Sequence, residues 1–431
     1  MDKKDRHIDT IAVQGAYEPK NGEPRVMPLA LSTTFAYDTA QDVANLFDLK
    51  ADGFFYTRLA NPTVAVFEGK MAMLEGGVGA VACASGQSAA TVALLNLCRA
   101  GQHIVAAGTL YGGTYNLLST TLPKLGIDCT FVDQTAPAET IAAAVRDNTR
   151  LIFAESLSNP GTEVLDFEKF AAVARQAGLP FIVDNTFPTP CLCRPFEFGA
   201  DIVVHSSTKY IDGHAVALGG VIVDSGRFDW TNGKFPELTE PDPSYHGLSY
   251  TKTFGKMAYL VKARAQLIRD MGAIMAPMNA WLACMNLETL HLRMERHTKN
   301  ATALAEWLER DERVAWVKYP GLKSDRNYAL AQKYLKGTSG VLTFGVKGGA
   351  KGGARAGEIF MNSLKLARIV VHVADSRTSV LHPASMTHRQ LNEEQLKAAG
   401  VSPELIRVSV GLEHIDDIIK DFDQALGKSQ G

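Results

Sequence analysis

The stretch VVHSSTKYIDGH, residues 203–214, places a lysine directly after a short apolar run and a cluster of hydroxyl side chains. A run of this kind is typical of a strand buried inside a sheet, and Lys209 then stands just past the carboxyl end of that strand. Lysine is rarely buried unless it has a partner or a chemical task. Lys209 is therefore the first candidate for chemistry, and its strand is the starting point for the fold.

Short apolar runs of the same kind recur along the chain before Lys209, and helical stretches separate most of them. These runs are GAVACAS (79–85), HIVAAG (103–108), DCTFVD (128–133), TRLIFAES (149–156), PFIVDN (180–185) and DIVVHSS (201–207). Alternation of strands and helices predicts a mainly parallel sheet covered by helices, which is an α/β fold.

The pattern along the chain predicts three parts. Residues 1–61 are rich in turn formers and predict an irregular, extended arm. Residues 62–276 form the α/β domain, and residues 277–431 form a smaller C-terminal α+β domain with strands in GVLTFGVKGG, ARIVVHVAD and LIRVSVGLE. The glycine-rich stretch 348–357 is predicted to be a loose turn, because it lacks the strand and helix that flank a phosphate-binding loop.

Composition and charge exclude several classes of protein. The chain has 431 residues, of which 46% are hydrophobic and 21% charged, and its formal net charge of -2 gives no support to a nucleic-acid partner. We expect no signal peptide in its first residues, because no apolar core follows their charges, and no membrane span, because no apolar stretch is long enough. The six cysteines do not form a disulfide framework or a metal site, and Cys191 and Cys193 are predicted to be buried thiols. We expect a protein of the reducing cytoplasm.

Polar side chains stand at three of the predicted strand ends, where parallel sheets collect their functional groups. Ser85, Gly86 and Gln87 follow GAVACAS at the start of a helix, where free N–H groups suit a phosphate, although Ser85 also suits a plain N-cap. Asp184 ends PFIVDN, and Lys209 follows the next strand.

A phosphate cradle, an acid and a lysine at neighbouring strand ends are the groups that pyridoxal phosphate requires. The lysine amine forms a Schiff base with the aldehyde, the acid keeps the ring nitrogen protonated, and the cradle holds the phosphate. An aromatic side chain to stack on the ring is available in Tyr111, which precedes two glycines, although a tyrosine there also suits a turn. A dehydrogenase is not supported, because no G-x-G-x-x-G follows a strand.

The chain resembles the Cys/Met-metabolism family of fold-type I pyridoxal-phosphate enzymes over essentially its whole length. The motifs that carry the resemblance are YTRLANPT (56–63), ASGQSA (84–89), YGGTYN (111–116), SNP (158–160), VDNT (183–186), HSSTKY (205–210), HPASMTH (382–388) and LIRVSVGLE (405–413). The resemblance implies a fold-type I α/β domain with pyridoxal 5′-phosphate as cofactor and no metal. It also implies a homo-oligomer, a tetramer built as a dimer of dimers.

Within the family the chain is most similar to the O-acetylhomoserine sulfhydrylases. Three features resemble this subgroup: YGGTYN, the arm sequence FDLKADGFFYTR (47–58) and the connection FDWTNGKFPELTEPDPSYHG (228–247). The implied reaction is γ-replacement in methionine and cysteine biosynthesis, in which O-acetyl-L-homoserine and sulfide, or a thiol, give L-homocysteine or its thioether and acetate.

The resemblance implies a role for each site residue. Lys209, Asp184 and Tyr111 are the catalytic residues: Lys209 forms the Schiff base, Asp184 pairs with the pyridinium nitrogen, and Tyr111 stacks on the ring. The other implied cofactor-binding residues are Ser85, Gly86, Gln87, Thr186, Ser206 and Thr208, together with Asn159 near the ring hydroxyl and Tyr56 and Arg58 reaching the cofactor phosphate of the neighbouring subunit. Substrate contacts are implied for Arg407 at the α-carboxylate, and for Tyr56 and Asn159.

One departure from the family pattern concerns the substrate carboxylate. Where many relatives have a serine-containing stretch, this chain has Val371, His372 and Val373. His372 either replaces that second carboxylate contact or is a packed histidine on a strand. His382 and His388 are interpreted as structural or as supporting the residues that touch the ligand.

Other activities within the family use the same cofactor site and stay open at this point. They are those of O-succinylhomoserine sulfhydrylase, cystathionine γ-synthase and methionine γ-lyase. A hypothesis of a different class is a non-catalytic pyridoxal-phosphate-binding scaffold, which predicts the loss of Lys209, Asp184 or Arg407; all three are present.

Overall fold

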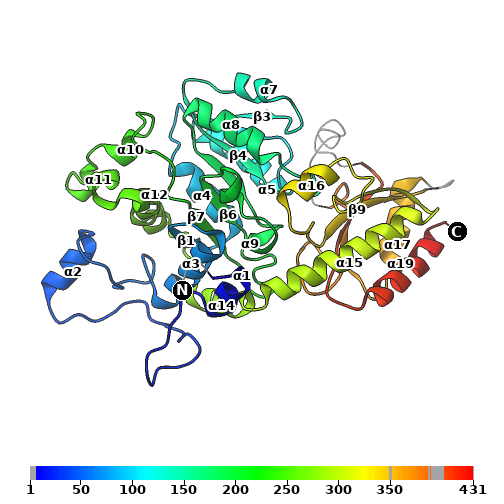
Figure 1. Ribbon diagram of the computed structural model, residues 1–431, viewed down its shortest axis with the longest axis horizontal. Coiled ribbons are helices and arrows are strands. Elements are labelled where there is room, and N and C mark those ends of the chain that lie inside the picture. The colour runs from blue at the N-terminus through cyan, green and yellow to red at the C-terminus, as the bar shows by residue number, and fades with distance from the viewer. Residues whose placement is uncertain (1–5, 349–351, 387–388, 390–401, 431) are drawn as a thin grey trace.

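The computed structural model describes residues 6–348, 352–386, 389 and 402–430, and it shows two sheets in one chain (Figure 1). The larger sheet has seven strands in the order β1-β7-β6-β5-β4-β2-β3. Its strands are β1 (Gly79–Cys83), β2 (His103–Ala107), β3 (Asp128–Val132), β4 (Thr149–Glu155), β5 (Phe181–Asp184), β6 (Ile202–His205) and β7 (Gly220–Asp224). The six apolar runs before Lys209 are thus all strands, and the predicted α/β class is confirmed.

The sheet is parallel from β3 through β6, and β7 runs antiparallel between β6 and β1. The register of the central strands sets Glu155 beside Asp184, and Asp184 beside Val204. The carboxyl ends of β4, β5 and β6 therefore lie side by side. The prediction missed β7, whose sequence GVIVD follows a loop instead of a crossover helix.

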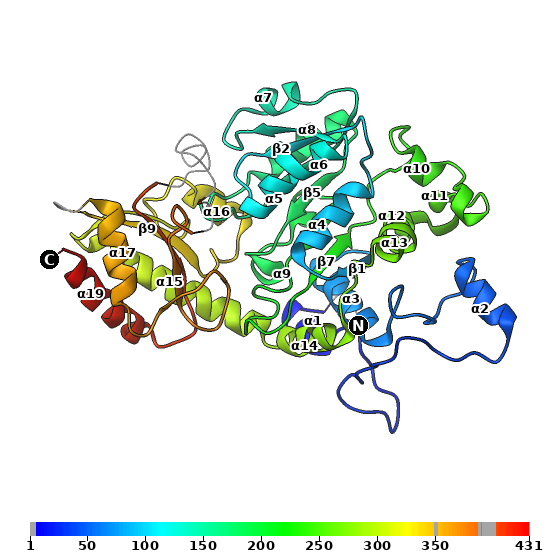
Figure 2. The same cartoon turned by 180° about the vertical axis from the view of Figure 1, so that it is seen from behind.

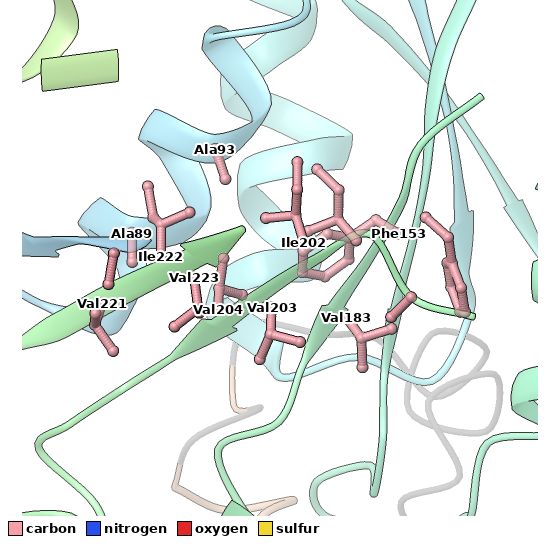
Figure 3. Packing of buried hydrophobic residues seen from close by; sticks show 14 of the residues in the cluster. Ala89, Ala93, Phe153, Val183, Ile202, Val203, Val204, Val221, Ile222 and Val223 are labelled. Atoms are coloured by element: carbon pink, nitrogen blue, oxygen red, sulfur yellow. The ribbon is translucent and has the colours of Figure 1, made fainter. Parts of the chain in front are cut away.

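Helices cover both faces of the larger sheet. Helix α4 (Gly86–Leu95) packs on β6 and β7, and α8 (Phe167–Ala177) packs on β4 and β5 on the opposite face (Figures 1 and 2). Figure 3 shows Ala89 and Ala93 of α4 lying against the aliphatic side chains of the central strands. Small residues on this helix bring its backbone close to the sheet, so the start of α4 sits next to the end of β6.

The remaining helices of the first 290 residues lie around this sheet, except for α2, which stands apart from it (Figure 1). They are α1 (Ile8–Gln14), α2 (Ala40–Phe47), α3 (Pro62–Glu75), α5 (Gly112–Asn116), α6 (Leu122–Lys124), α7 (Ala138–Ala143), α9 (Thr189–Leu192), α10 (Pro236–Thr239), α11 (Tyr250–Phe254), α12 (Ala258–Lys262), α13 (Arg269–Met271) and α14 (Pro277–Leu287). Short 3-10 helices lie at Pro195–Phe198, Pro243–Tyr245 and Gly255–Met257, and π-helical turns at Leu117–Thr121 and Ala263–Ile268.

The second sheet has five strands in the order β10-β11-β12-β9-β8 and is mostly antiparallel. Its elements are β8 (Val314–Lys318), β9 (Val341–Val346), β10 (Arg368–Ile369), β11 (Ser379–Leu381) and β12 (Leu405–Ser409), with α15 (Leu290–Arg310), α16 (Tyr328–Tyr334), α17 (Gly353–Ser363) and α19 (Ile415–Gln430). The long helix α15 runs from the large sheet to the small one (Figure 1). A small C-terminal α+β part is therefore confirmed, whereas the boundary at residue 277 stays a prediction.

Two predictions in this part of the chain are corrected. The strand expected in ARIVVHVAD is only two residues long, Arg368–Ile369, and a bend follows at Val371. The loose turn expected over residues 348–357 is wrong from Gly353 onward, where α17 begins. Ala356, Phe360 and Met361 of that helix are buried at helical spacing, and this apolar face outweighs the glycines.

The predicted arm is partly helical. Helix α1 packs against α3 and α15, and α2 stands away from the body of the molecule (Figure 1). Thr39 caps α2 by accepting a hydrogen bond from the backbone N–H of Asp42 at 3.1 Å, which explains why a helix forms here. The remainder of the segment up to Asn61 is extended or turn-like, as predicted.

The cysteines and the helices agree with two further expectations. All six cysteines are unpaired, and Cys191 and Cys193 are buried as predicted. Burial raises the pKa of the Cys191 thiol to about 12. Within the ranges that the structure describes, no helix has both the length and the apolar character needed to cross a bilayer.

Candidate active site

A cavity of about 710 Å³ lies at the carboxyl ends of β4, β5 and β6. It is bounded on one side by the start of α4 and on another by residues of the small sheet. Eleven of the predicted site residues line it: Ser85, Gly86, Gln87, Tyr111, Asn159, Asp184, Thr186, Ser206, Thr208, Lys209 and Arg407. The order of the strands thus gathers side chains that are up to 322 residues apart in the sequence.

Lys209 lies in a turn directly after β6. Its backbone N–H donates to the Ser206 carbonyl at 3.2 Å, and its own carbonyl accepts from the Gly213 N–H at 2.7 Å. The amine is within 3.4 Å of Nδ1 of His372. Burial, followed by the positive charge of Arg407, lowers the pKa of Lys209 to about 8. An amine with such a pKa is present in its neutral, nucleophilic form to a far greater extent than an exposed lysine.

Asp184 closes β5 and faces the same cavity. Its Oδ1 accepts a hydrogen bond from the backbone N–H of Thr186 at 2.9 Å, and the Thr186 hydroxyl accepts from the backbone N–H of Ser206 at 2.9 Å. This chain of bonds ties the end of β5 to the end of β6. Burial raises the pKa of Asp184, and no cation among the described residues forms an ion pair with it. The carboxyl group is therefore suited to a cationic N–H group of a ligand.

The start of α4 forms a narrow cradle beside Ser206. Ser85 caps the helix: its hydroxyl accepts a hydrogen bond from the backbone N–H of Ser88 at 3.0 Å. The N-cap function considered for Ser85 is therefore present. A Cβ on Gly86 would lie 2.4 Å from the Cβ of Ser206, so only glycine fits. Thr208 is fixed by its hydroxyl, which donates to the Gly219 carbonyl at 3.2 Å. Backbone N–H groups and hydroxyls thus converge where a phosphate would bind.

Tyr111 follows β2 and is 52% exposed, with its ring along the cavity. Its backbone N–H donates to Oε1 of Glu155 at 2.6 Å. A Cβ on Gly113 would lie 2.5 Å from Cε1 of Tyr111, so this glycine lets the ring lie flat against the turn. The position of the ring therefore depends on Glu155 beneath it and on Gly113 beside it.

Arg407 comes from β12 of the small sheet and is buried. Its Nη1 donates to Oδ1 of Asn159 at 3.2 Å, and its Nη2 donates to the carbonyl of Val371 at 3.2 Å. Both partners are neutral, and its Nε has no partner among the described residues. Burial lowers the pKa of Arg407 to about 10, since no carboxylate compensates its charge. A planar cation of this kind is suited to a carboxylate ligand.

The remaining predicted residues lie elsewhere. Tyr56 and Arg58 line a separate hollow of about 490 Å³ on the arm, where Nη1 of Arg58 donates to the carbonyl of Arg269. Both nitrogens of His382 are bonded within the small domain, to Ser385 Oγ at 2.8 Å and to the Pro403 carbonyl at 2.7 Å, which agrees with the structural interpretation. His388 lies outside the described residues.

The fold and the cavity define a pyridoxal-phosphate enzyme of the mainly parallel α/β class. A model of the family described as Cys/Met metabolism PLP-dependent enzyme matches residues 9–427. The chain belongs to this family, as its motifs predict.

Curated relatives and a solved structure agree with this assignment. The chain is 47% identical to O-acetyl-L-homoserine sulfhydrylase of Leptospira meyeri over 97% of this chain and 96% of that protein. It is 47% identical to homocysteine synthase of Schizosaccharomyces pombe, with 99% of each chain covered. A crystal structure of an O-acetylhomoserine (thiol)-lyase from Campylobacter jejuni, which contains N′-pyridoxyl-lysine-5′-monophosphate, superposes with a TM-score of 0.94 at 35% identity, covering 98% of this chain and 100% of that chain.

The residues of the cavity fit pyridoxal phosphate, the cofactor of the family. The glycine at the start of α4 leaves space that a Cβ would fill, and the hydroxyls of Ser206 and Thr208 stand beside it. Asp184 offers a half-buried carboxyl group that no cation among the described residues pairs with, and Lys209 offers an amine whose pKa is lowered. The donor set therefore matches a phosphate, a ring nitrogen and an aldehyde.

Two residues of the site were not assigned to it from the sequence. Glu155 ends β4 in register with Asp184, so the strand-end argument that selected Asp184 would also have found it. His372 was considered as a second contact to the substrate carboxylate or as a packed histidine, and no sequence signal places it beside Lys209. It lies between β10 and β11 rather than on a strand.

We predict that Glu155 supports the Tyr111 turn as a neutral acid. Burial and the charge of Asp184 raise the pKa of Glu155 well above its usual range, so glutamine is a close mimic of the native side chain. Glu155→Gln should keep the affinity of the apoenzyme for pyridoxal phosphate within about twofold. Glu155→Ala should weaken it about tenfold, because a buried N–H without a partner costs about 1–3 kcal/mol.

Titration of the apoenzyme with cofactor at pH 7, followed by absorbance, measures both effects. Glu139→Gln, on the exposed surface of α7, is the matched control for loss of a carboxylate. If Glu155→Gln weakens binding as much as Glu155→Ala, the side chain acts through its charge and the prediction is wrong.

Proposed function

We propose that the chain catalyses γ-replacement on O-acetyl-L-homoserine, in which sulfide or a thiol displaces acetate and sulfide gives L-homocysteine. The observation that carries this proposal is the pairing, in one cavity, of the Lys209 amine with the uncompensated Arg407 guanidinium. Such a pair binds and deprotonates an amino acid rather than an amine or a carbonyl compound. The names of the curated relatives, at 47% identity over nearly the whole chain, support the homoserine ester as the amino acid.

Different residues of the cavity would bind different parts of the cofactor. The N–H groups of Gly86 and Gln87, together with the hydroxyls of Ser206 and Thr208, would hold the phosphate; Asp184 would pair with the ring nitrogen. When bound, pyridoxal phosphate supplies an electron sink for the carbanion that forms at the substrate α-carbon. Tyr111 would stack on the ring, Asn159 would lie near its hydroxyl, and Lys209 would hold its aldehyde carbon.

The chain's own residues handle the substrate and its protons. Arg407 would bind the α-carboxylate and so orient the α-hydrogen toward the amine of Lys209. Lys209 would take that proton and then assist proton transfer at the β-carbon, since its pKa of about 8 lies near neutral pH. Acetate leaves from the γ-carbon, and the sulfur nucleophile adds there. The hydroxyl of Tyr111, at the cavity wall, would orient the leaving group.

We further propose a homo-oligomer, a dimer of dimers, in which the arm of one subunit completes the site of another. Tyr56 and Arg58 do not line their own subunit's cavity. The arm that carries them extends from the body of the chain (Figure 2), and Tyr56 is 38% exposed. An exposed tyrosine and arginine on an extended arm are well placed to reach a partner. Six unpaired cysteines suit a reducing compartment such as the cytoplasm.

We predict that Lys209 is the residue that binds the cofactor covalently. Borohydride reduction of the holoenzyme should fix a pyridoxyl group on the peptide that contains Lys209, detected by mass spectrometry. Lys209→Ala should still bind the cofactor without a covalent bond, while turnover falls by about 10²–10⁴-fold, the usual effect of losing a general base. A pyridoxyl group on any other lysine would show that the site is assigned wrongly.

The acyl donor distinguishes the proposed function from its alternatives. We expect kcat/KM with sulfide to be higher for O-acetyl-L-homoserine than for O-succinyl-L-homoserine, by about tenfold or more if the pocket contributes about 1.4 kcal/mol. Homocysteine, cystathionine and 2-oxobutyrate are quantified in the same assay. A preference for the succinyl ester, or cystathionine or 2-oxobutyrate as the main product, would assign one of the other activities of the family.

Mixed oligomers test whether the arm completes a neighbouring site. Arg58→Ala and Lys209→Ala should each be nearly inactive alone. Co-expressed, they form mixed dimers in which one site has both native residues and the other has neither. Random pairing makes about half of the dimers mixed, so activity should recover to roughly a quarter of the native value for a two-fold interface. Activity that stays at the average of the two mutants, with mixed dimers present, would place Arg58 outside the partner's site.

A further inference from the structure

His372 makes a contact to the catalytic lysine that the proposed reaction does not yet use. Its Nδ1 lies 3.4 Å from Nζ of Lys209, and both side chains line the same cavity. The two residues are 163 positions apart in the chain: Lys209 lies in the turn after β6, and His372 lies between β10 and β11. The contact therefore exists only where the small sheet meets the large one.

The direction of this hydrogen bond follows from the chemistry of the two groups. A lysine ammonium has three N–H donors and no acceptor, so Nδ1 must accept and the imidazole proton must be on Nε2. Burial, followed by the charge of Lys209, lowers the pKa of His372 to about 4, so the ring is neutral near pH 7. The charged groups that influence the ring are Lys209 and Arg407, which are cationic, and Asp375 and Asp212, which are anionic.

The backbone around His372 is fixed by the strand that carries Arg407. The Val371 carbonyl accepts from Nη2 of Arg407 at 3.2 Å, and the backbone N–H of Ala374 donates to Ser409 Oγ at 2.7 Å. Ala374 has a φ of 69°, a conformation that a residue with a Cβ adopts only when its surroundings hold it there. The imidazole is thus attached to a rigid support, unlike the four-carbon stem of Lys209.

We propose that His372 is a positioning residue for the reaction inferred above: its Nδ1 accepts a hydrogen bond from the unattached amine of Lys209 and holds that amine beside Arg407. The unattached amine, once neutral, can donate one of its N–H groups to Nδ1 while its lone pair takes the substrate proton. An amine that is held in place loses less freedom when the substrate binds, so proton transfer is faster. This role rests on the proposed function, but the contact itself can be tested without any substrate.

Substitution of His372 by asparagine or by glutamine distinguishes the roles of its two ring nitrogens. The Oδ1 of asparagine can occupy the place of Nδ1, whereas the amide of glutamine reaches the place of Nε2. We expect His372→Asn to preserve the hydrogen bond to Lys209, and His372→Gln and His372→Leu to lose it. His246→Asn, a change in a side chain that is 88% exposed and outside the cavity, is the matched control.

The first measurement uses the apoenzyme, so it does not depend on catalysis. The rate at which trinitrobenzenesulfonate modifies Lys209 is followed against pH, and the labelled peptide is identified by mass spectrometry. An accepted hydrogen bond stabilises the ammonium, so its loss should lower the pKa of Lys209, from about 8 in the native chain, by about one unit in His372→Leu and His372→Gln. His372→Asn and the control should match the native chain.

The second measurement separates positioning from substrate binding. Loss of the Nδ1 acceptor in His372→Leu and His372→Gln should lower kcat about tenfold. KM for O-acetyl-L-homoserine should stay within about twofold of the native value. The acid limb of the kcat profile should move to lower pH by about one unit, because Lys209 stays neutral to lower pH. His372→Asn should restore both quantities.

Three outcomes would overturn the proposal. The first is a native pKa of Lys209 in both His372→Leu and His372→Gln. The second is better rescue by glutamine than by asparagine, which would assign the role to Nε2. The third is a rise in KM with kcat unchanged, which would place the imidazole on the substrate. The comparison of the two amides stands even if His372→Leu does not fold. If no homoserine ester reacts but the pKa shift is present, the proposed function fails and the Lys209–His372 contact stands.

Discussion

The site depends on the parallel register of β4, β5 and β6, which brings three strand ends to one edge of the sheet. Glu155 pairs with Asp184 in that register, and Lys209 follows the next strand. Because these strands are buried on both faces, their polar residues appear only at the strand ends. Helix α4 packs closely on β6 and β7 through small residues, and this places the N–H groups of its first turn at the same edge. One packing constraint therefore sets the acid, the amine and the phosphate cradle together.

The second sheet supplies what the first cannot, which is a group that recognises the substrate. Arg407 reaches the cavity from β12 and is bonded to Asn159 of the large domain at 3.2 Å. A buried guanidinium with only neutral partners is unfavourable by itself, and a ligand carboxylate removes that cost. The stability of the contact between the two sheets and the affinity for an amino-acid substrate are thus linked through one side chain.

Much of this arrangement could be predicted from the sequence, because its signals are local. Lys209 and Asp184 follow apolar runs that are unmistakable as strands, and the order of motifs defined the family. The antiparallel strand β7, the helix α2 and the contact of His372 were not predicted. Two of these depend on where distant segments meet: β7 is inserted between β6 and β1, and His372 approaches Lys209 only through the rigid support of β12. Local patterns carry no information about such meetings. Helix α2 instead begins at a local N-cap, Thr39, which the prediction of an extended arm missed.

Four of the ionisable groups that line the cavity share one electrostatic feature. Burial is the first cause of every shift: it lowers the pKa of Lys209 and of Arg407, and it raises the pKa of Asp184 and of Glu155. Burial thus disfavours the charged form of each group, so the site gains from a ligand that supplies opposite charges. A ligand that carries a phosphate, a protonated ring nitrogen and a carboxylate places an opposite charge beside each cationic or acidic group in turn. The carboxylate would offset the charge of Arg407, and the ring nitrogen would favour the ionised form of Asp184. The amine of Lys209, whose pKa is about 8, stays close to the point at which a base both accepts and returns a proton.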